Sequence, residues 1–361
     1  MIHYHCQTTC HLLHFKQPAG TSRGIYTTRK IWLIRLTADE WPGQQGIGEC
    51  APLPQLSQED RPDFEAQLAH FCRQAEEKGW EALDDPALSA FPSIRFGLET
   101  AFLQLHAGRI VVWDTPFTRG EAGIPINGLI WMGDYPTMLQ RIEAKLQAGF
   151  RCIKLKIGAI DFEQELALLR HIRAHFSARE IELRVDANGA FAPADALTKL
   201  QQLAELDLHS IEQPIRAGQW EEMARLCSES PLPIALDEEL IGVNQLDKKR
   251  LLLETIHPTY IILKPSLHGG LTGCEEWIRL SREVIPSSPA GGPSYWVTSA
   301  LESNIGLTAI AQWCAALNNP LPQGLGTGML FTDNWPMPLE IRGDQLWFIP
   351  EQEEVCQKIK L

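Results

Sequence analysis

The sequence lacks the features that would place the protein in a membrane, secreted or nucleic-acid-binding class. No stretch approaches the roughly 18 consecutive apolar residues of a membrane-spanning helix, and the N-terminus lacks the basic and then apolar layout of a signal peptide. Basic residues number 32 against 45 acidic ones, for a formal net charge of −13, and they are scattered rather than gathered into a stripe. We therefore expect a cytoplasmic protein with no membrane and no nucleic-acid partner.

Paired cysteines are also lacking. The nine cysteines are an odd number without a Cys-x-x-Cys motif, which predicts reduced and mostly buried thiols. Near the N-terminus, histidines and cysteines crowd together, namely His3, His5, Cys6, Cys10, His11 and His14. Their spacing matches no standard zinc module, so metal binding there stays open. We expect a strand, with apolar contacts supplied by Tyr4, Leu12, Leu13 and Phe15.

The 361 residues show two successive sequence patterns. Residues 1–60 read as strands and turns, with a loop expected at 18–24, and apolar spacings of three and four follow to about residue 108. This pattern predicts a small α+β domain over residues 1–120. After residue 124, short apolar runs alternate with amphipathic helices, one of them capped by Asp161. We expect a (β/α) barrel over 121–335 and a segment, 336–361, that returns to the small domain.

Eight strands are expected in the barrel, and five of them end on an ionisable residue. The strands are placed near 125–130, 151–156, 181–186, 208–212, 233–237, 259–264, 294–299 and 321–325. The five residues are Lys156, Asp186, Glu212, Asp237 and Lys264, separated by 30, 26, 25 and 27 positions, each about one βα unit. A parallel barrel collects these ends on one face, where barrel enzymes place their chemistry.

The alternation of side chains along each strand predicts which way these residues point. Ile153 and Leu155 face the outer helices, which sends Lys154 and Lys156 into the barrel. The same test places the other four strand-end residues inside. Converging carboxylates repel one another unless a cation is present, so Asp186, Glu212 and Asp237 predict a Mg²⁺ site, with Mn²⁺ as a substitute. The alternative is a structural network in which Lys and Arg, including Arg184, neutralise the acids.

The lysines receive separate roles. A second ammonium on the same face and a nearby divalent cation both favour the neutral amine of Lys156, which can then take a proton. Lys154 is that electrostatic neighbour. Lys264 lies across the mouth, where it can stabilise a developing anion or act as a second acid or base. Asn188 and Glu238 are candidates for orienting the metal ligands.

These motifs resemble a known family. Lys154-Leu155-Lys156, Val185-Asp186-Ala187-Asn188, Ile211-Glu212-Gln213-Pro214, Asp237-Glu238 and Leu263-Lys264-Pro265 are similar to the muconate-lactonising subgroup of the enolase superfamily. The resemblance implies an α/β fold with an enolase-type (β/α)7β-like TIM barrel and an α+β N-terminal capping domain completed by the C-terminal segment. Residues 298–303 and 324–328 are most similar to the o-succinylbenzoate synthase family of menaquinone biosynthesis, as is the loop at 18–29.

The resemblance implies a small carboxylate substrate and assigns roles to individual residues. The reaction would be loss of water from 2-succinyl-6-hydroxy-2,4-cyclohexadiene-1-carboxylate to give 2-succinylbenzoate. Asp186, Glu212 and Asp237 would bind Mg²⁺, Lys156 would act as base and then acid, and Lys264 would stabilise the enediolate. Substrate contacts would come from Ser299, Gly326, Thr327 and Arg29.

Other activities remain open. Lys156 and Lys264 on opposite sides are a ready pair of bases for an N-acylamino acid racemase or a dipeptide epimerase, and muconate cycloisomerase uses the same scaffold. Dipeptide epimerases carry an Asp-x-Asp signature near the eighth strand, where this chain has residues 324–328, Gly-Leu-Gly-Thr-Gly. A non-catalytic barrel is the alternative of another class. The sequence does not distinguish a monomer from a homo-oligomer.

Overall fold

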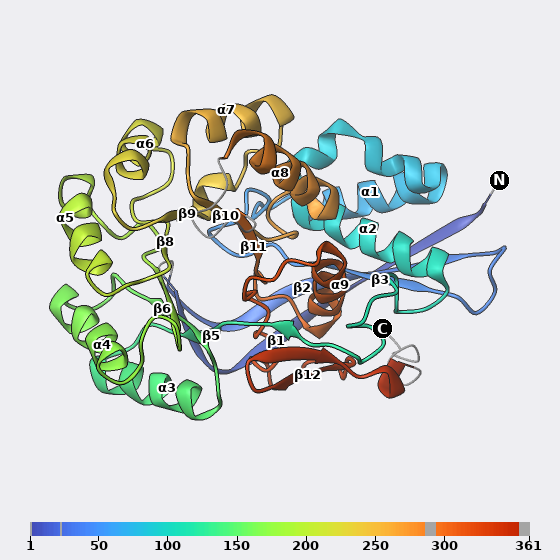
Figure 1. Cartoon of the computed structure of the whole chain (residues 1–361). Coiled ribbons are helices and arrows are strands. Elements are labelled where there is room, and N and C mark those ends of the chain that lie inside the picture. Colours follow the sequence, from blue (N-terminus) through green and yellow to red (C-terminus); the bar gives the residue numbers. More distant parts are fainter. Residues whose placement is uncertain (1, 22–23, 286–293, 354–361) are drawn as a thin grey trace.

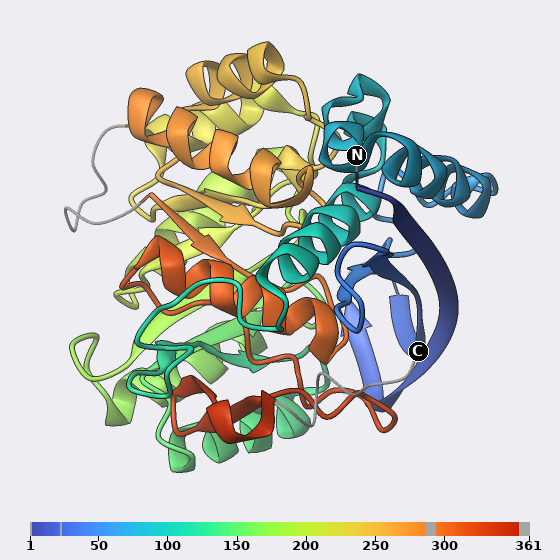
Figure 2. The same cartoon turned by 90° about the vertical axis from the view of Figure 1, so that its right-hand side faces the viewer.

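The computed structural model describes residues 2–21, 24–285 and 294–353. It contains an antiparallel sheet with two long helices on one side, and a barrel of parallel strands enclosed by helices (Figure 1). In the view turned by 90°, the antiparallel sheet and its helices lie together on one side of the barrel (Figure 2). In the described residues, no helix combines the length and the apolar character needed to cross a bilayer.

The antiparallel sheet has the order β1-β2-β3, and β1 and β2 form one long hairpin. Its alternation buries both faces of β2: Ile31 and Leu33 pack toward the barrel, while Ile34 and Leu36 pack toward the helices. Gly48 lets a helix lie directly on β3, because a Cβ there would come within 1.7 Å of the Gly97 carbonyl oxygen. The elements are β1 (Tyr4–Thr21), β2 (Gly24–Ala38), β3 (Gly46–Cys50), α1 (Phe64–Lys78), η1 (Gly79–Asp84), η2 (Pro86–Ala90) and α2 (Pro92–Ala107).

Two expectations about this region need correction. Residues 18–21 and 24 were expected in a loop, but they belong to β1 and β2, whose pairing continues past an irregularity between His14 and Ala19. Leu12 was expected to supply an apolar contact, but it is 51% exposed because alternation turns Leu13 and Phe15 inward instead. The strand expected around the histidines and cysteines is confirmed: His3, His5 and His14 pair with Glu40, Asp39 and Asp333 on neighbouring segments.

The cysteines follow the expectation where they are described. Eight are free thiols, of which Cys50, Cys72, Cys152, Cys274 and Cys314 are buried. Cys356 lies outside the described residues.

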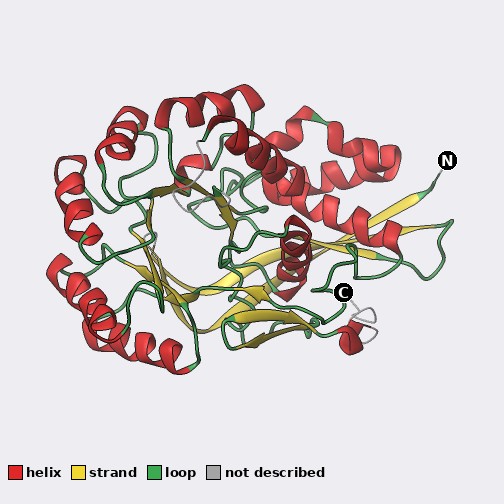
Figure 3. Cartoon of the chain, in the orientation of Figure 1, coloured by secondary structure: helices red, strands yellow, loops and turns green. Residues whose placement is uncertain are grey.

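The barrel contains, among the described residues, seven parallel strands in the order β5-β6-β7-β8-β9-β10-β11. Helices lie around the outside of these strands (Figure 3). The strands are β5 (Gly128–Ile130), β6 (Cys152–Lys156), β7 (Glu182–Asp186), β8 (Ser210–Glu212), β9 (Ile234–Leu236), β10 (Tyr260–Leu263) and β11 (Tyr295–Val297). The eighth position is held by two isolated parallel bridges, Ile126↔Gln323 and Thr298↔Gly324. The expected strand positions and the enolase-type fold are thus confirmed, although the eighth strand is reduced to these bridges.

Helices surround the strands and bury their apolar faces against them. In α4, Leu166, Leu169 and Ile172 are buried, and the Asp161 side chain accepts a hydrogen bond from the Glu163 N–H, as its capping role predicts. The helices are α3 (Tyr135–Gln147), α4 (Phe162–His175), α5 (Pro193–Ala204), α6 (Trp220–Glu229), η3 (Glu238–Leu240), α7 (Leu246–Ile256), α8 (Gly270–Val284) and α9 (Asn304–Leu317).

The C-terminal segment forms a hairpin, β12 (Leu339–Arg342) with β13 (Gln345–Phe348), followed by η4 (Pro350–Gln352). β13 pairs with β4 (Ile124–Pro125), and Phe348 packs edge-on against Phe117. The hairpin therefore lies against the stretch that leads from α2 into the barrel. The domain boundaries at residues 120 and 335, and the assignment of 336–361 to the capping domain, stay predictions.

Candidate active site

A cavity of about 380 Å³ opens at the carboxyl ends of the barrel strands. The five strand-end residues line it, and Gln17, Tyr26, Leu53 and Leu56 from the antiparallel-sheet side cover it. A second cavity of about 360 Å³ lies behind Asn188 and Glu238, which line both. The main cavity thus lies where the two parts of the molecule meet, as in many barrel enzymes.

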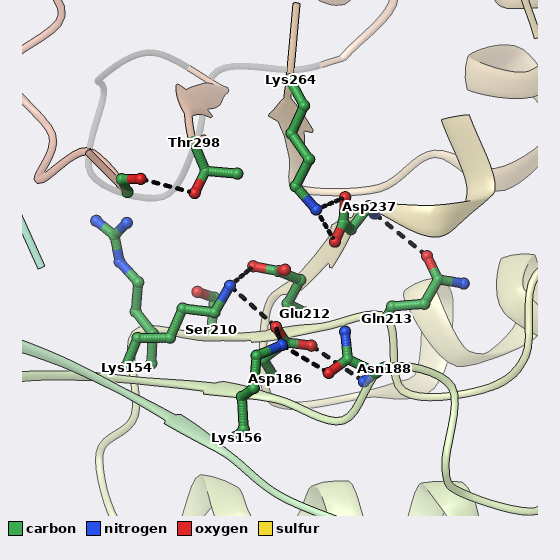
Figure 4. Close-up of polar contacts among 12 residues, drawn as sticks. Lys154, Lys156, Asp186, Asn188, Ser210, Glu212, Gln213, Asp237, Lys264 and Thr298 are labelled. Carbon is green, nitrogen blue, oxygen red and sulfur yellow. Dashed lines mark hydrogen bonds and ion pairs between the residues drawn. The ribbon is translucent and has the colours of Figure 1, made fainter. Parts of the chain in front are cut away.

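The convergence predicted from alternation is confirmed, and the side chains point toward one another (Figure 4). The outward residues of β6 to β10, such as Leu155 and Val185, lie in the hydrophobic core beneath the helices. On the inner side, Lys154 Nζ is 2.6 Å from Glu212 Oε2 and 3.0 Å from Asp186 Oδ2. Lys264 Nζ is 2.6 Å from Asp237 Oδ1. A lysine ammonium group therefore contacts each of the three carboxyl groups, which lie on adjacent strands.

Burial and mutual repulsion shape the charges of the carboxyl groups. The pKa of Asp186 is lowered although burial opposes this, because Lys154 and Lys156 both lie beside it. The pKa of Asp237 is lowered by Lys264 in the same way. Glu212 differs, since burial together with the charge of Asp186 raises its pKa well above the ordinary value. Ionising all three carboxyl groups therefore requires more positive charge than the lysines alone provide.

Lys154 and Lys264 are held as ammonium groups by these acids. Burial alone would lower the pKa of Lys154, but Asp186 and Glu212 outweigh it and raise the pKa. Asp237 raises the pKa of Lys264 against the same effect of burial. Arg184 does not take part in this neutralisation, because it donates to Glu182 and to the Pro322 carbonyl oxygen.

The donor set suits a hard divalent cation. In the part of the chain that the structure describes, no three His, Cys, Asp or Glu side chains already surround a common point at metal-binding distance, and lysine ammonium groups contact the three carboxylates instead. Glu212 Oε1 is buried without a hydrogen-bond partner among the described residues. This oxygen of the central carboxyl group is therefore available to coordinate a cation. Oxygen ligands of this kind are those that Mg²⁺ prefers.

Asn188 connects Lys156 to Asp186 and Glu238 through hydrogen bonds. Its Oδ1 lies 2.7 Å from Lys156 Nζ, its N–H donates to Asp186 Oδ1, and its Nδ2 donates to Glu238 Oε1. Lys156 Nζ also lies 3.0 Å from Asp186 Oδ2. Burial, assisted by the charge of Asp237, raises the pKa of Glu238 to about 7. Lys156 is thus held between an amide and a carboxylate oxygen.

The four expected substrate contacts separate into two groups. Ser299, Gly326 and Thr327 line the cavity. Arg29 does not: it is 2% exposed, and its guanidinium donates to the backbone carbonyl oxygens of Ala51, Pro52, Ala300 and Leu301. Arg29 is therefore placed to hold two loops together rather than to touch a substrate.

Sequence reasoning missed residues at the mouth. Asn127, Leu129 and Trp131 line the cavity, while Ile126 and Ile130 lie in the core on the other face of the strand. The alternation test that found the lysines would have found these too. Glu302 was also missed, and it accepts hydrogen bonds from Ser266 Oγ, Ser299 Oγ and the Ala300 N–H.

Known proteins share this arrangement over nearly the whole chain. Residues 137–343 match the model described as "Enolase C-terminal domain-like", and residues 21–105 match "MenC, N-terminal domain". The o-succinylbenzoate synthase of Desulfotalea psychrophila is 46% identical, over 92% of this chain and 96% of that protein.

Solved structures agree. The crystal structure of MenC from Desulfotalea psychrophila has a TM-score of 0.81 and 43% identity, covering 95% of this chain and 99% of that one. The o-succinylbenzoate synthase from Thermosynechococcus elongatus, complexed with Mg in its active site, shares the fold with a TM-score of 0.74 and 24% identity over 92% and 95%. The matches to both family models and the 46% identity to a relative show that the chain belongs to the o-succinylbenzoate synthase family of the enolase superfamily.

Proposed function

We propose that the cavity catalyses the loss of water from 2-succinyl-6-hydroxy-2,4-cyclohexadiene-1-carboxylate, giving 2-succinylbenzoate in menaquinone biosynthesis. The observation that carries this proposal is the placement of Lys156 and Lys264 on either side of three carboxylates at the strand ends. A proton next to a carboxylate is very weakly acidic, so an enzyme that removes it must stabilise the resulting enediolate. Ammonium groups in a buried cavity serve that purpose.

Lys156 acts first as base and then as acid. As the free amine, its Nζ takes the proton from the ring carbon that bears the carboxylate. The electron pair of the broken C–H bond passes to the carboxylate, giving the enediolate. It then returns to form a ring double bond as the bond between the neighbouring carbon and its hydroxyl breaks. The ammonium formed on Lys156 returns a proton to the departing hydroxyl, which leaves as water. One lysine on one face of the ring is enough for this syn elimination, and formation of the aromatic ring favours the product.

Lys264 and Lys154 provide fixed positive charge. Their raised pKa values keep both as ammonium groups, which suits electrostatic stabilisation and not proton abstraction. Lys264 faces the site from the strand opposite Lys156 and stabilises the enediolate. Lys154 neutralises Asp186 and Glu212.

Asp186, Glu212 and Asp237 would hold Mg²⁺, for which Mn²⁺ is a chemically reasonable substitute. When bound, the ion would supply positive charge to the substrate carboxylate as negative charge develops there. Asn188 and Glu238 would orient Asp186 and Lys156 through their hydrogen bonds.

The surrounding residues shape the substrate site. Ser299, Gly326 and Thr327 form part of the wall, and Arg29 acts through the loop at 300–301. In the proposed division, residues 1–120 form the capping domain, residues 121–335 form the catalytic barrel, and residues 336–361 return to the capping domain.

The direct test is to incubate the purified protein with Mg²⁺ and the cyclohexadiene substrate and to follow the loss of diene absorbance. We expect turnover with Mg²⁺ and none after its removal with a chelator. Racemisation of N-succinylamino acids is assayed in parallel, because the same two lysines could support it. Racemisation without dehydration would overturn the proposal.

A further inference from the structure

Two buried polar side chains remain unpaired on the cavity wall that faces the acids. We propose that Asn127 and Thr327 bind the carboxylate at the far end of the substrate's succinyl arm. This inference rests on the proposed function, and it adds a second recognition site to the one that holds the ring carboxylate.

Asn127 reaches the cavity from the residue just before β5. It is 5% exposed, its Oδ1 is buried without a hydrogen-bond partner, and its side chain makes no hydrogen bond to any described residue. Its backbone is fixed, because the Asn127 N–H donates to the Gln323 carbonyl oxygen at 3.0 Å. A half-turn of the amide exchanges its oxygen and nitrogen, so Asn127 can offer an N–H donor to the cavity without moving its backbone.

Thr327 lines the same cavity from the turn that follows the eighth strand position. It is 7% exposed, and its Oγ1 is also buried without a hydrogen-bond partner among the described residues. The preceding residue, Gly326, brings this turn close to the first strand position, since a Cβ there would lie 3.7 Å from Ile126 Cδ1 and 3.8 Å from the Asn127 carbonyl oxygen. An amide and a hydroxyl therefore belong to neighbouring segments of one cavity wall.

Strand order places this pair opposite the acids. Asp186, Glu212 and Asp237 end the third, fourth and fifth strand positions, while Asn127 and Thr327 belong to the first and the eighth. A ring carboxylate held at the acids directs the rest of the molecule toward this wall. A substrate with one carboxylate at each end then meets polar groups at both ends of the cavity.

The chemistry of the unpaired atoms selects the arm's carboxylate. Among the described cavity-lining side chains, buried unpaired atoms belong to Glu212, Glu238, Asn127 and Thr327. The two glutamates would repel an anion, which leaves the amide and the hydroxyl as the donors among these buried unpaired atoms. Lys145, which also lines the cavity, lies with its Nζ 4.5 Å from the centre of the Phe150 ring. Arg141 already donates to the carbonyl oxygens of Trp131 and Met132. An unpaired buried polar group costs free energy until a ligand satisfies it, which makes this pair selective for a hydrogen-bonding end group.

The test compares two ligands that differ only at that end. Dissociation constants are measured by calorimetry with Mg²⁺ for 2-succinylbenzoate and for 2-butanoylbenzoate, in which a methyl group replaces the arm's carboxylate. We expect Asn127→Ala and Thr327→Val each to weaken binding of 2-succinylbenzoate about 10- to 100-fold, as expected for hydrogen bonds to a charged group. Binding of 2-butanoylbenzoate should change less than about twofold.

Further variants separate recognition from folding. Asn127→Asp should weaken 2-succinylbenzoate more than Asn127→Ala does, because it adds a like charge, and Thr327→Ser should restore most of the affinity. Thr255→Val, the same change on the outer helix α7, should bind both ligands as the unmodified protein does. Equal losses for both ligands in Asn127→Ala, or unchanged affinity for 2-succinylbenzoate, would overturn the inference. If the unmodified protein neither binds 2-succinylbenzoate nor performs the dehydration, the proposed function fails and the inference falls with it.

Discussion

Two neighbours hold Lys156 in place at the end of β6. Asp186 Oδ2 and Asn188 Oδ1 lie 3.0 Å and 2.7 Å from its Nζ, and Asn188 is itself bonded to Glu238. A flexible four-carbon side chain is thereby confined to one position, which lowers the entropy that would be lost on reaching the transition state.

We expect Lys156→Ala to lower kcat for dehydration by at least about 10³-fold, because general acid–base catalysis contributes 10²- to 10⁴-fold and Lys156 serves in both steps. The rate is measured from diene absorbance with Mg²⁺. Circular dichroism and Mg²⁺ affinity should stay close to those of the unmodified protein. Substantial residual turnover in a well-folded variant would mean that another residue is the base.

Lys154 is expected to matter for stability as well as for rate. In the absence of Mg²⁺, Lys154→Ala leaves Asp186 and Glu212 buried without their shared ammonium, which should lower the free energy of unfolding by about 3–5 kcal/mol in urea titrations. Lys30→Ala removes an exposed ion pair with Glu65 and should cost less than about 1 kcal/mol. Saturating Mg²⁺ should reduce the loss of unfolding free energy caused by Lys154→Ala. The same loss with and without Mg²⁺ would contradict the proposed metal site.

The orientation of a single residue can be predicted from the sequence where apolar residues flank a polar one within a strand. Ile153 and Leu155 identify the inward lysines in this way. Arg29 shows the limit, because its partners at 51–52 and 300–301 are far apart in the sequence and its guanidinium is satisfied by backbone carbonyl groups. No local sequence pattern predicts such a role.

Buried glutamates cap three helices from elsewhere in the chain. Glu49 of β3 accepts from the N–H groups of Ser303 and Gly306 at the start of α9, and Glu99 of α2 accepts from the Leu271 N–H in α8. Glu59 accepts from the Ser93 N–H in α2. Carboxyl oxygens placed at helix N-termini accept hydrogen bonds from the free N–H groups there. Two of these three glutamates, Glu49 and Glu99, join the antiparallel-sheet region to the barrel.

We expect Glu49→Ala to lower the free energy of unfolding by about 1–3 kcal/mol, because it leaves several buried donors unsatisfied. Glu163→Ala, in the exposed first turn of α4, should change it by less than about 0.5 kcal/mol. Both are measured by denaturant titration at constant pH. A loss for Glu49→Ala no larger than that for Glu163→Ala would contradict the assigned capping role.

Glu59 predicts a pH dependence of stability. Burial raises its pKa from 4.5 to about 8, so the folded protein binds more protons than the unfolded chain between these values. Its contribution is fully present below pH 4.5 and is lost as the pH rises through 8. Glu59→Gln should therefore reduce the fall in unfolding free energy measured between pH 6 and pH 9. The same fall in both proteins would show that Glu59 does not titrate in this range.

Element positions in the barrel could be read from the sequence because each βα unit repeats one apolar pattern. The hairpin of β1 and β2 was read incorrectly at 18–21, since Pro18 and Gly20 favour a turn locally and cross-strand pairing overrides this preference. The eighth strand position was located, but its reduction to two bridges depends on contacts with its neighbours that no single segment encodes.

At the scale of the whole molecule, a bound cation should stabilise the fold. The ammonium groups of Lys154 and Lys264 face three carboxyl groups, and a divalent cation would add the positive charge that suits an anionic substrate. Binding of an ion to the folded state alone raises stability, by about 2.7 kcal/mol at 100 times its dissociation constant. Mg²⁺ should therefore raise the unfolding midpoint, and a chelator should lower it. Asp237→Asn should lose most of this shift while Lys156→Ala keeps it. An unfolding midpoint of the unmodified protein that does not change with Mg²⁺ would contradict a metal site at these acids.

The fold as a whole was predictable from the order of its motifs, because five ionisable strand ends at intervals of one βα unit leave few other architectures. The covering of the mouth by Gln17, Tyr26, Leu53 and Leu56 was not, since it depends on how two parts of the chain pack in space.

The two bridges that complete the barrel have a consequence for how ligand preference could be changed separately from the chemistry. The lysines proposed to carry the reaction lie at the ends of β6 and β10, whereas the wall proposed to bind the far end of the ligand lies beside Ile126↔Gln323 and Thr298↔Gly324. Main-chain hydrogen bonds hold this seam, among them those from the Gln323 N–H to the Pro125 carbonyl oxygen and from the Asn127 N–H to the Gln323 carbonyl oxygen. The Asn127 and Thr327 side chains make no hydrogen bond to described residues, so replacing them should alter ligand preference while the scaffold and its proton chemistry stay unchanged.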